Sequence, residues 1–281
     1  MRITVKDNAV LLSDLQGFSA DRTFDCGQCF RFDKVGDSWQ GVAFGKFVTF
    51  TQPTTSELII FPCSPDDLDM WIGFLGLEED YCQKQTEILA SATSCGAGEL
   101  LTGAIKAGDG IRILRQEKWE TLCSFIISQN NNISRIKKII ASLSAELGEP
   151  TKCGKGYTFP TPQAIFGAGE ERLRKLGLGF RAGYVLSAAE MIYCGKLDLE
   201  EVEKADFEQA RDMLIAIKGV GPKVAACALL FGFGKGEAFP EDVWIKRSLL
   251  RFPDGFSPAV FGKNAGLAQQ YLFYYERYGN Y

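Results

Sequence analysis

The sequence predicts an α+β protein in which an antiparallel β-sheet domain comes first and a helical domain follows. Up to about residue 63, apolar and polar side chains alternate and short turn sequences separate the runs, as in half-buried strands. Beyond that point the apolar spacing changes to three and four residues, which is the period of an amphipathic helix. With 281 residues, 46% of them hydrophobic, the chain is long enough to bury a substantial core.

The strands are expected in stretches such as QCFRFDKVGDSWQGVAFGKFVTFTQ, where Gly36-Asp37 and Gly45-Lys46 separate runs rich in Phe, Val and Thr. After the strands, Ser64 is expected to cap the first helix, because acidic residues follow it in the first turn. We therefore predict an antiparallel sheet domain with flanking helices over residues 1–105 and a helical domain over residues 106–281.

Helical periodicity continues almost to the end of the chain, in segments that short Gly and Pro turns separate. These segments are KWETLCSFIISQNNNISRIKKIIASL, FRAGYVLSAAEMIY, DFEQARDMLIAI, PKVAACALLFGF and NAGLAQQYLFYYERY. Two places depart from helix rules. One is the asparagine run at residues 130–132, and the other is the glycine turn GVGPK at residues 219–223.

The composition excludes several kinds of chemistry. There is no histidine, so Ser-His-Asp and Cys-His nucleophiles are impossible, and acid–base work falls to Asp, Glu, Lys, Cys or Tyr. Nine cysteines, an odd number, favour a reducing compartment over a disulfide framework. Cys26 and Cys29 have the spacing of a redox motif or of half a zinc site. Without a second such pair or a histidine, we expect core residues there and no metal.

The start of the chain, MRITVKDNAVLLSDL, alternates between apolar and polar residues and does not read as a secretory signal. No apolar run reaches the length of a membrane span. We therefore expect an intracellular protein with no membrane partner. We expect it in the cytoplasm of a bacterium and, by default, as a monomer.

Charge is distributed unevenly along the chain. The overall net charge is −4, but residues 1–105 carry 7 Lys and Arg against 15 Asp and Glu, whereas residues 106–281 carry 24 against 20. The helical half is therefore basic, with a net charge of +4. This excess is compatible with an ordinary solvated surface and with a surface that faces nucleic acid.

The glycine turn predicts a helix–hairpin–helix. Gly219 stands where a left-handed residue ends a helix, and Pro222 stands at a first helical position. The amides of Gly219, Val220 and Gly221, with the helix N-terminus that follows, can bind an anion such as a DNA phosphate. A plain hairpin between two helices remains the alternative.

Two charged residues flank the second helix of this hairpin. Lys223 follows Pro222 directly, and an amine beside a phosphate-binding turn is a candidate nucleophile. Asp242 follows Pro240 on the far side of the helix. A phosphate or solvent contact for the lysine, and a helix cap for the aspartate, are the structural alternatives.

Four motifs, which follow the family's order along the chain, resemble the 8-oxoguanine DNA glycosylase family. LIAIKGVGPKVAACALLFG followed by FPEDVW is similar to the helix–hairpin–helix–Gly/Pro–Asp signature of the DNA glycosylase superfamily, in its bifunctional form with the lysine. GQCFRF at Gly27–Phe32, FIISQNNNISRI at Phe125–Ile136 and LRKLGLGFRAGYV at Leu173–Val185 narrow the resemblance to that family. It implies that the helical half is a helix–hairpin–helix DNA glycosylase domain.

The resemblance also implies a reaction. Lys223 attacks C1′ of the nucleotide, expels the damaged base and leaves a Schiff base that can undergo β-elimination. Asp242 stabilises the positive charge that develops on the sugar. The enzyme acts on double-stranded DNA that contains 8-oxoguanine, preferably opposite cytosine, and needs no cofactor. A reaction at C1′ inside a duplex requires the nucleotide to leave the base stack.

The resemblance implies that four residues contact the DNA around the lesion. Asn130 enters the vacated space, Arg135 and Arg181 address the orphaned cytosine, and Phe180 wedges beside it. From the residues alone, the asparagine run is a surface turn and both arginines bind phosphates.

For the damaged base itself, the resemblance implies that the Gly27 carbonyl accepts the proton on N7. Phe273 and Cys227 sandwich the ring, and Gln269 bonds its Watson–Crick edge. By periodicity alone Phe273 and Cys227 are core residues. A glycine at position 27 leaves room for the base.

The sequence departs from the family pattern at two positions. Trp244 stands where relatives have a histidine that meets phosphate, so its indole N–H is expected to be the only side-chain donor there. Phe180 stands where many relatives have tyrosine. No cysteine follows Cys227, which excludes the iron–sulfur cluster of some relatives.

Two other functions remain open: an alkylated-base glycosylase, which lacks the lysine, and a non-catalytic module that binds damaged DNA.

Overall fold

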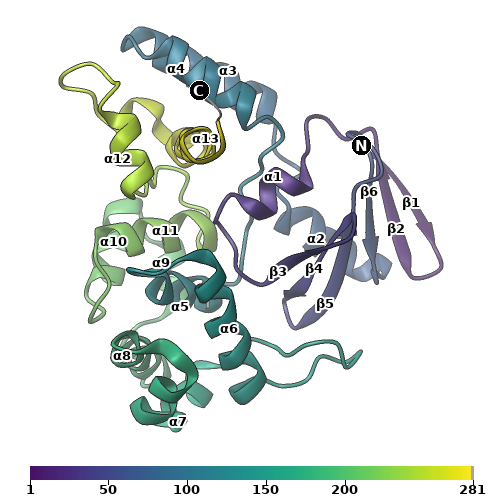
Figure 1. The fold of residues 1–281 in the computed structure, drawn as a ribbon, viewed down its shortest axis with the longest axis vertical. Helices are drawn as coiled ribbons and strands as arrows, with labels where there is room; N and C mark the ends of the chain where they lie inside the picture. Colours follow the sequence, from purple (N-terminus) through teal and green to yellow (C-terminus); the bar gives the residue numbers. More distant parts are fainter. Residues whose placement is uncertain (280–281) are drawn as a thin grey trace.

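The computed structural model describes residues 1–279 and confirms an N-terminal antiparallel sheet followed by a mainly helical region (Figure 1). The sheet has six strands in the order β1-β2-β6-β5-β4-β3, and every neighbouring pair is antiparallel. The strands are β1 (Arg2–Lys6), β2 (Ala9–Ser13), β3 (Phe32–Val35), β4 (Ser38–Ala43), β5 (Lys46–Thr51) and β6 (Leu58–Phe61).

One face of the sheet is buried, as the alternating pattern requires. Val10 lies opposite Ile60, and Ile60 lies opposite Phe50, and all three side chains are fully buried. An aromatic cluster extends this layer toward α2 (Leu68–Phe74), where Trp71 packs edge-on against Phe50. The sheet thus has its own hydrophobic core.

A second core lies within the helical region. It is built around α5 (Lys118–Ser128), α8 (Arg181–Tyr193) and α11 (Pro222–Gly232). The other helices of this region are α6 (Ile133–Leu147), α7 (Pro162–Leu173), a π-helical turn (Arg174–Leu178), α9 (Leu199–Lys204) and α10 (Phe207–Ile215). These helices position the glycine turn and the asparagine run.

A third core joins the two ends of the chain. The helices α3 (Tyr81–Ser94) and α4 (Gly98–Ala107) pack against α13 (Ala265–Tyr278), with Ile88, Leu101 and Tyr271 buried between them. Figure 1 shows these helices at one end of the molecule and α7 and α8 at the other. The expected boundary after residue 105 falls inside α4, and the division into domains stays a prediction.

Two local expectations need correction. A short helix, α1 (Ala20–Asp25), interrupts the strands, and its cap is Ser19. The Ser64 hydroxyl does not cap a helix amide; it donates to the Asp67 carboxylate at 2.9 Å, ahead of a 3₁₀ turn at Pro65–Asp67. Within residues 1–279, no helix is long and apolar enough to cross a bilayer.

Candidate active site

The glycine turn joins α10 to α11, and its geometry requires glycine at one position for two reasons. Gly219 has a φ of +84°, in the left-handed region, and a Cβ there would lie 2.2 Å from Cγ of Tyr184. The Val220 amide donates to the Ile217 carbonyl at 3.0 Å, and Pro222 is the first residue of α11. Among the described residues, the amides of Gly219 and Gly221 have no protein acceptor, so both can bind an external anion.

Lys223 lies in the first turn of α11 and is half-buried. Its Nζ is 5.5 Å from the centroid of the Phe125 ring. One turn further along α11, burial raises the pKa of the Cys227 thiol, the Lys223 amine opposes this shift, and the Asp242 carboxylate adds to it. The charges of Lys223 and Asp242 therefore both act on the Cys227 thiol, although Asp242 belongs to a different element.

Asp242 caps α12 (Val243–Leu249). One carboxylate oxygen, Oδ1, accepts hydrogen bonds from the amides of Trp244 and Ile245, both at 2.9 Å. These two bonds fix the orientation of the carboxylate and leave its other oxygen outside the cap.

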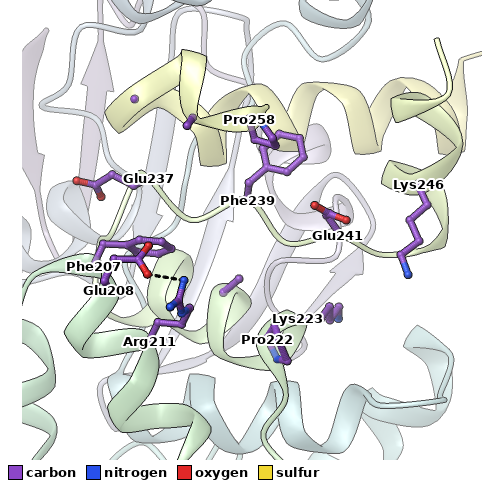
Figure 2. Close-up of a pocket in the computed structure, with 13 residues that line it drawn as sticks. Phe207, Glu208, Arg211, Pro222, Lys223, Glu237, Phe239, Glu241, Lys246 and Pro258 are labelled. Carbon is purple, nitrogen blue, oxygen red and sulfur yellow. Dashed lines mark ion pairs between the residues drawn. The ribbon is translucent and has the colours of Figure 1, made fainter. Parts of the chain in front are cut away.

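A cleft of about 770 Å³ opens beside Lys223. Figure 2 shows Lys223 and Pro222 at the start of α11, Glu241 on the segment before α12, and Lys246 on α12. An ion pair of 2.5 Å joins Glu208 to Arg211 on the opposite side. The amine is thus reachable from solvent. Within residues 1–279, no group of three or more Cys, Asp or Glu side chains could hold a metal ion.

The residues expected to contact the base lie on three separate elements. Gly27 has a φ of +74°, and a Cβ there would lie 3.5 Å from the Phe273 ring, so the loop backbone faces that ring. Gln269 is only 3% exposed; its amide donates to the Pro240 carbonyl at 3.2 Å and accepts from Gln270 at 2.8 Å. Beyond these two bonds, the Gln269 amide keeps one N–H and one oxygen lone pair for a further partner.

The asparagine run forms an exposed turn between α5 and α6. Asn130 has a φ of +47°, which asparagine tolerates better than most residues, and its side chain is exposed. Asn132 caps α6 by accepting from the Arg135 amide at 2.9 Å. Asn130 is therefore displayed at the surface by a turn with a well-defined backbone.

Arg181 binds this turn from the neighbouring helix. It is 3% exposed, and its guanidinium donates to the Gln129 carbonyl at 2.7 Å and to the Asn130 carbonyl at 2.8 Å. Burial lowers the pKa of Arg181, and the nearby charge of Arg135 lowers it further. Arg181 thus supports the turn, whereas Arg135 is exposed.

Phe180 is 47% exposed, although it is a large apolar side chain. The Arg181 guanidinium carbon lies 4.4 Å from its ring centroid. The structure therefore brings together the four residues that the sequence associated with the DNA around the lesion: Asn130, Arg135, Phe180 and Arg181.

Sequence reasoning missed three features near this site. Arg247 lies 5.0 Å from the Trp244 ring, so the indole N–H is not the only side-chain donor in that region. Arg31 pairs with Glu120 at 3.0 Å. Tyr184 covers Gly219. Arg247 could have been found from its helical spacing of three residues after Trp244. The other two contacts join segments far apart in sequence, so no local pattern predicts them.

Comparisons with known proteins define the class first. Residues 123–253 match the profile of the helix–hairpin–helix–Gly/Pro–Asp superfamily of base excision DNA repair proteins, so this region is a DNA glycosylase domain by family. Residues 10–122 match the N-terminal domain of 8-oxoguanine DNA glycosylases. The chain belongs to the 8-oxoguanine DNA glycosylase family.

Individual relatives agree with this assignment. The chain is 41% identical over 152 residues to an N-glycosylase/DNA lyase of Saccharomyces cerevisiae, a match that covers 49% of this chain and 40% of the yeast protein. It is 30% identical over 209 residues to a probable N-glycosylase/DNA lyase of Methanothermobacter thermautotrophicus, covering 63% of this chain and 67% of the relative.

Among solved structures, the chain resembles the 8-oxoguanine glycosylase/lyase of Clostridium acetobutylicum in complex with double-stranded DNA that has cytosine opposite 8-oxoguanine. The TM-score is 0.91 at 34% identity, and the match covers 100% of this chain and 99% of that one.

Proposed function

We propose that this protein is a bifunctional DNA glycosylase that excises 8-oxoguanine from double-stranded DNA and cleaves the resulting abasic site by β-elimination. Its substrate is a duplex in which the lesion lies opposite cytosine. The enzyme works as a monomer, and in a bacterium it acts in the cytoplasm, where the chromosome lies. Family membership and the match to an enzyme in complex with such a duplex support this proposal.

The chemistry follows from the residues around the hairpin. The amine of Lys223 forms a bond to C1′ while the bond from C1′ to the base breaks, and the base leaves with the bonding electrons. Asp242 stabilises the positive charge that develops on the sugar. The attached nitrogen then gives up a proton and O4′ takes one as the C1′–O4′ bond breaks, which leaves a protonated Schiff base between Lys223 and C1′. Loss of the C2′ proton from this Schiff base breaks the bond to the 3′ oxygen, which cuts the strand.

The observation that carries the proposal is the position of Lys223 in the first turn of α11, beside two hairpin amides that have no acceptor among the described residues, with the charges of Lys223 and Asp242 both acting on the Cys227 thiol. An alkylated-base glycosylase does not need this lysine, and a binding module needs neither residue. The hairpin binds a phosphate next to the flipped nucleotide, which holds C1′ close to the amine.

Borohydride trapping tests the nucleophile. Wild-type protein should become covalently attached to a duplex with one 8-oxoguanine, because only an amine forms a reducible Schiff base. Lys223→Gln should abolish trapping and strand cleavage while DNA binding persists. Lys218→Gln, an exposed lysine just before the hairpin, is the matched control and should trap normally. Persistent trapping in Lys223→Gln would assign the nucleophile to another residue.

A further inference from the structure

Tyr184 touches the phosphate-binding hairpin from α8. Its half-buried ring lies directly against Gly219, where the position of a Cβ would be 2.2 Å from Cγ and 2.4 Å from both Cδ atoms. The hairpin therefore has no free space on this side. Any shift of Gly219 toward α8 has to move the Tyr184 ring, because packed side chains have no room to absorb it.

The same ring also touches Phe180, one helical turn earlier. The two ring centroids are 5.9 Å apart with an interplanar angle of 77°, which is an edge-to-face contact. Phe180 is the N-cap residue of α8 and follows Gly179, whose φ of +59° and ψ of −131° are accessible to glycine almost alone. The Phe180 ring is exposed, but the Tyr184 ring contacts it and the Gly179 backbone restricts where it can lie.

The contacts continue from Phe180 to the Asn130 turn. Arg181 packs on the Phe180 ring and donates hydrogen bonds to the carbonyls of Gln129 and Asn130. An unbroken path of contacts thus runs from Gly219 through Tyr184, Phe180 and Arg181 to Asn130. Its two ends are the hairpin that binds a phosphate and the turn that enters the base stack.

We propose that Tyr184 is a positioning residue that couples phosphate binding at the hairpin to insertion of Phe180 and Asn130 into the duplex. The inference rests on the proposed function, since it concerns how the same site extrudes a nucleotide. Tyr184 does not touch the sugar or the base. When the hairpin binds the phosphate, the Tyr184 ring sets where Phe180 stands relative to the base stack.

The first test compares substrates that differ in how much base stacking must be broken. In Tyr184→Ala, single-turnover excision from an 8-oxoguanine·cytosine pair should fall about 10- to 100-fold, the range expected when a remote change misplaces reacting groups. Strand cleavage at a preformed abasic site, which needs Lys223 but no base extrusion, should stay close to the wild-type rate. This cleavage also reports that the variant is folded.

Tyr184→Phe is the matched variant. The Tyr184 hydroxyl has no hydrogen-bond partner among the described residues, so the ring alone makes both contacts and this variant should behave as the wild type. If Tyr184→Ala lowers the excision rate and the rate of cleavage at the abasic site by the same factor, Tyr184 has a general role in folding or binding, and the coupling is overturned. An unchanged excision rate in Tyr184→Ala would also overturn it.

A second measurement does not depend on excision. A 2-aminopurine placed beside a tetrahydrofuran abasic analogue becomes brighter when a neighbouring wedge unstacks it. Saturating wild-type protein and Tyr184→Phe should raise this fluorescence, whereas saturating Tyr184→Ala should raise it much less. An equal rise in all three proteins contradicts the coupling. If wild-type protein fails to excise 8-oxoguanine, the proposed function is wrong, and this fluorescence comparison still decides the role of Tyr184.

Discussion

The carboxylate of Asp242 caps a helix and is proposed to stabilise the charge on the sugar, and a single substitution can separate the two roles. Its Oδ1 caps α12 through two amides, and asparagine provides an equivalent acceptor. Asp242→Asn should therefore change the free energy of unfolding by less than about 1 kcal/mol. The loss of negative charge beside the developing cation should slow base excision about 100-fold.

Asp206→Asn is the control for this substitution, because Asp206 caps α10 through the Gln209 amide at 2.9 Å. It should leave excision unchanged. Thermal unfolding and single-turnover excision, measured for both variants, give the answer. A folded Asp242→Asn protein with nearly wild-type excision would mean that this aspartate is only a helix cap.

The two arginines near Asn130 stand in different environments, so their substitutions should have different effects. Arg135 is exposed, whereas Arg181 is buried and bound to the turn, and both are proposed to contact the orphaned cytosine. Arg135→Ala should weaken the preference for cytosine over adenine by about 1–3 kcal/mol, the usual worth of a well-made hydrogen-bonded pair between a side chain and a base. Arg181→Ala should slow excision opposite every base, because the turn itself loosens, and should lower the preference as well.

Single-turnover excision opposite each of the four bases tests this prediction. Arg172→Ala is a suitable control, since Arg172 of α7 forms an exposed ion pair with Glu146 of α6. Equal wild-type rates opposite cytosine and adenine would exclude a cytosine-reading role for both arginines.

At the scale of secondary structure, the elements that local signals specify could be predicted from the sequence. The turns at Gly36 and Gly45 join β3, β4 and β5 as their glycines predict, and both glycines have positive φ angles. The short helix α1 was missed because its six residues lie between strand-like runs, and their period is too brief to detect. Ser64 carries a cap signal, but its hydroxyl donates to Asp67.

The site could be predicted only in part, for a physical reason. Lys223 and the hairpin are local: glycine, proline and lysine follow one another, and helix rules give their order. The placement of Asp242 near Cys227 and the contact of Tyr184 with Gly219 are tertiary features, and no periodicity encodes them. The resemblance to a family paired Asp242 with Lys223, and only the structure revealed the Tyr184 contact.

At the scale of the whole molecule, the net charge of −4 conceals a basic helical half. If phosphate contacts are concentrated there, the logarithm of the DNA affinity should fall linearly with the logarithm of salt concentration, by about 0.9 per phosphate neutralised. Arg247→Ala should lower this slope by about 1, because Arg247 is exposed beside the Asp242 cap. A salt-independent affinity would argue against a duplex substrate.

A buried hydrogen bond between Arg31 and Glu120 joins the sheet region to the helical region. Arg31, in the loop before β3, donates to Glu120 of α5 at 3.0 Å and also to the Tyr157 carbonyl. Only 9% of the arginine side chain and 12% of the glutamate side chain are exposed. Burial raises the pKa of Glu120 to about 7; the charge of Arg31 opposes this shift and that of Glu117 adds to it.

This raised pKa predicts how stability depends on pH. Between pH 4.5, the ordinary value for glutamate, and about 7, folded Glu120 keeps a proton that the unfolded chain releases. Glu120 therefore favours the folded state most at low pH, and this contribution is lost as pH rises through that window, by an amount on the order of 3 kcal/mol.

Glu120→Gln cannot titrate, so its free energy of unfolding should rise relative to wild type between pH 5 and pH 8. Urea unfolding across this range measures the difference, with the exposed Glu149→Gln as control. The opposite trend, in which Glu120→Gln loses stability relative to wild type as pH rises, would mean that Arg31 outweighs burial and holds Glu120 ionised.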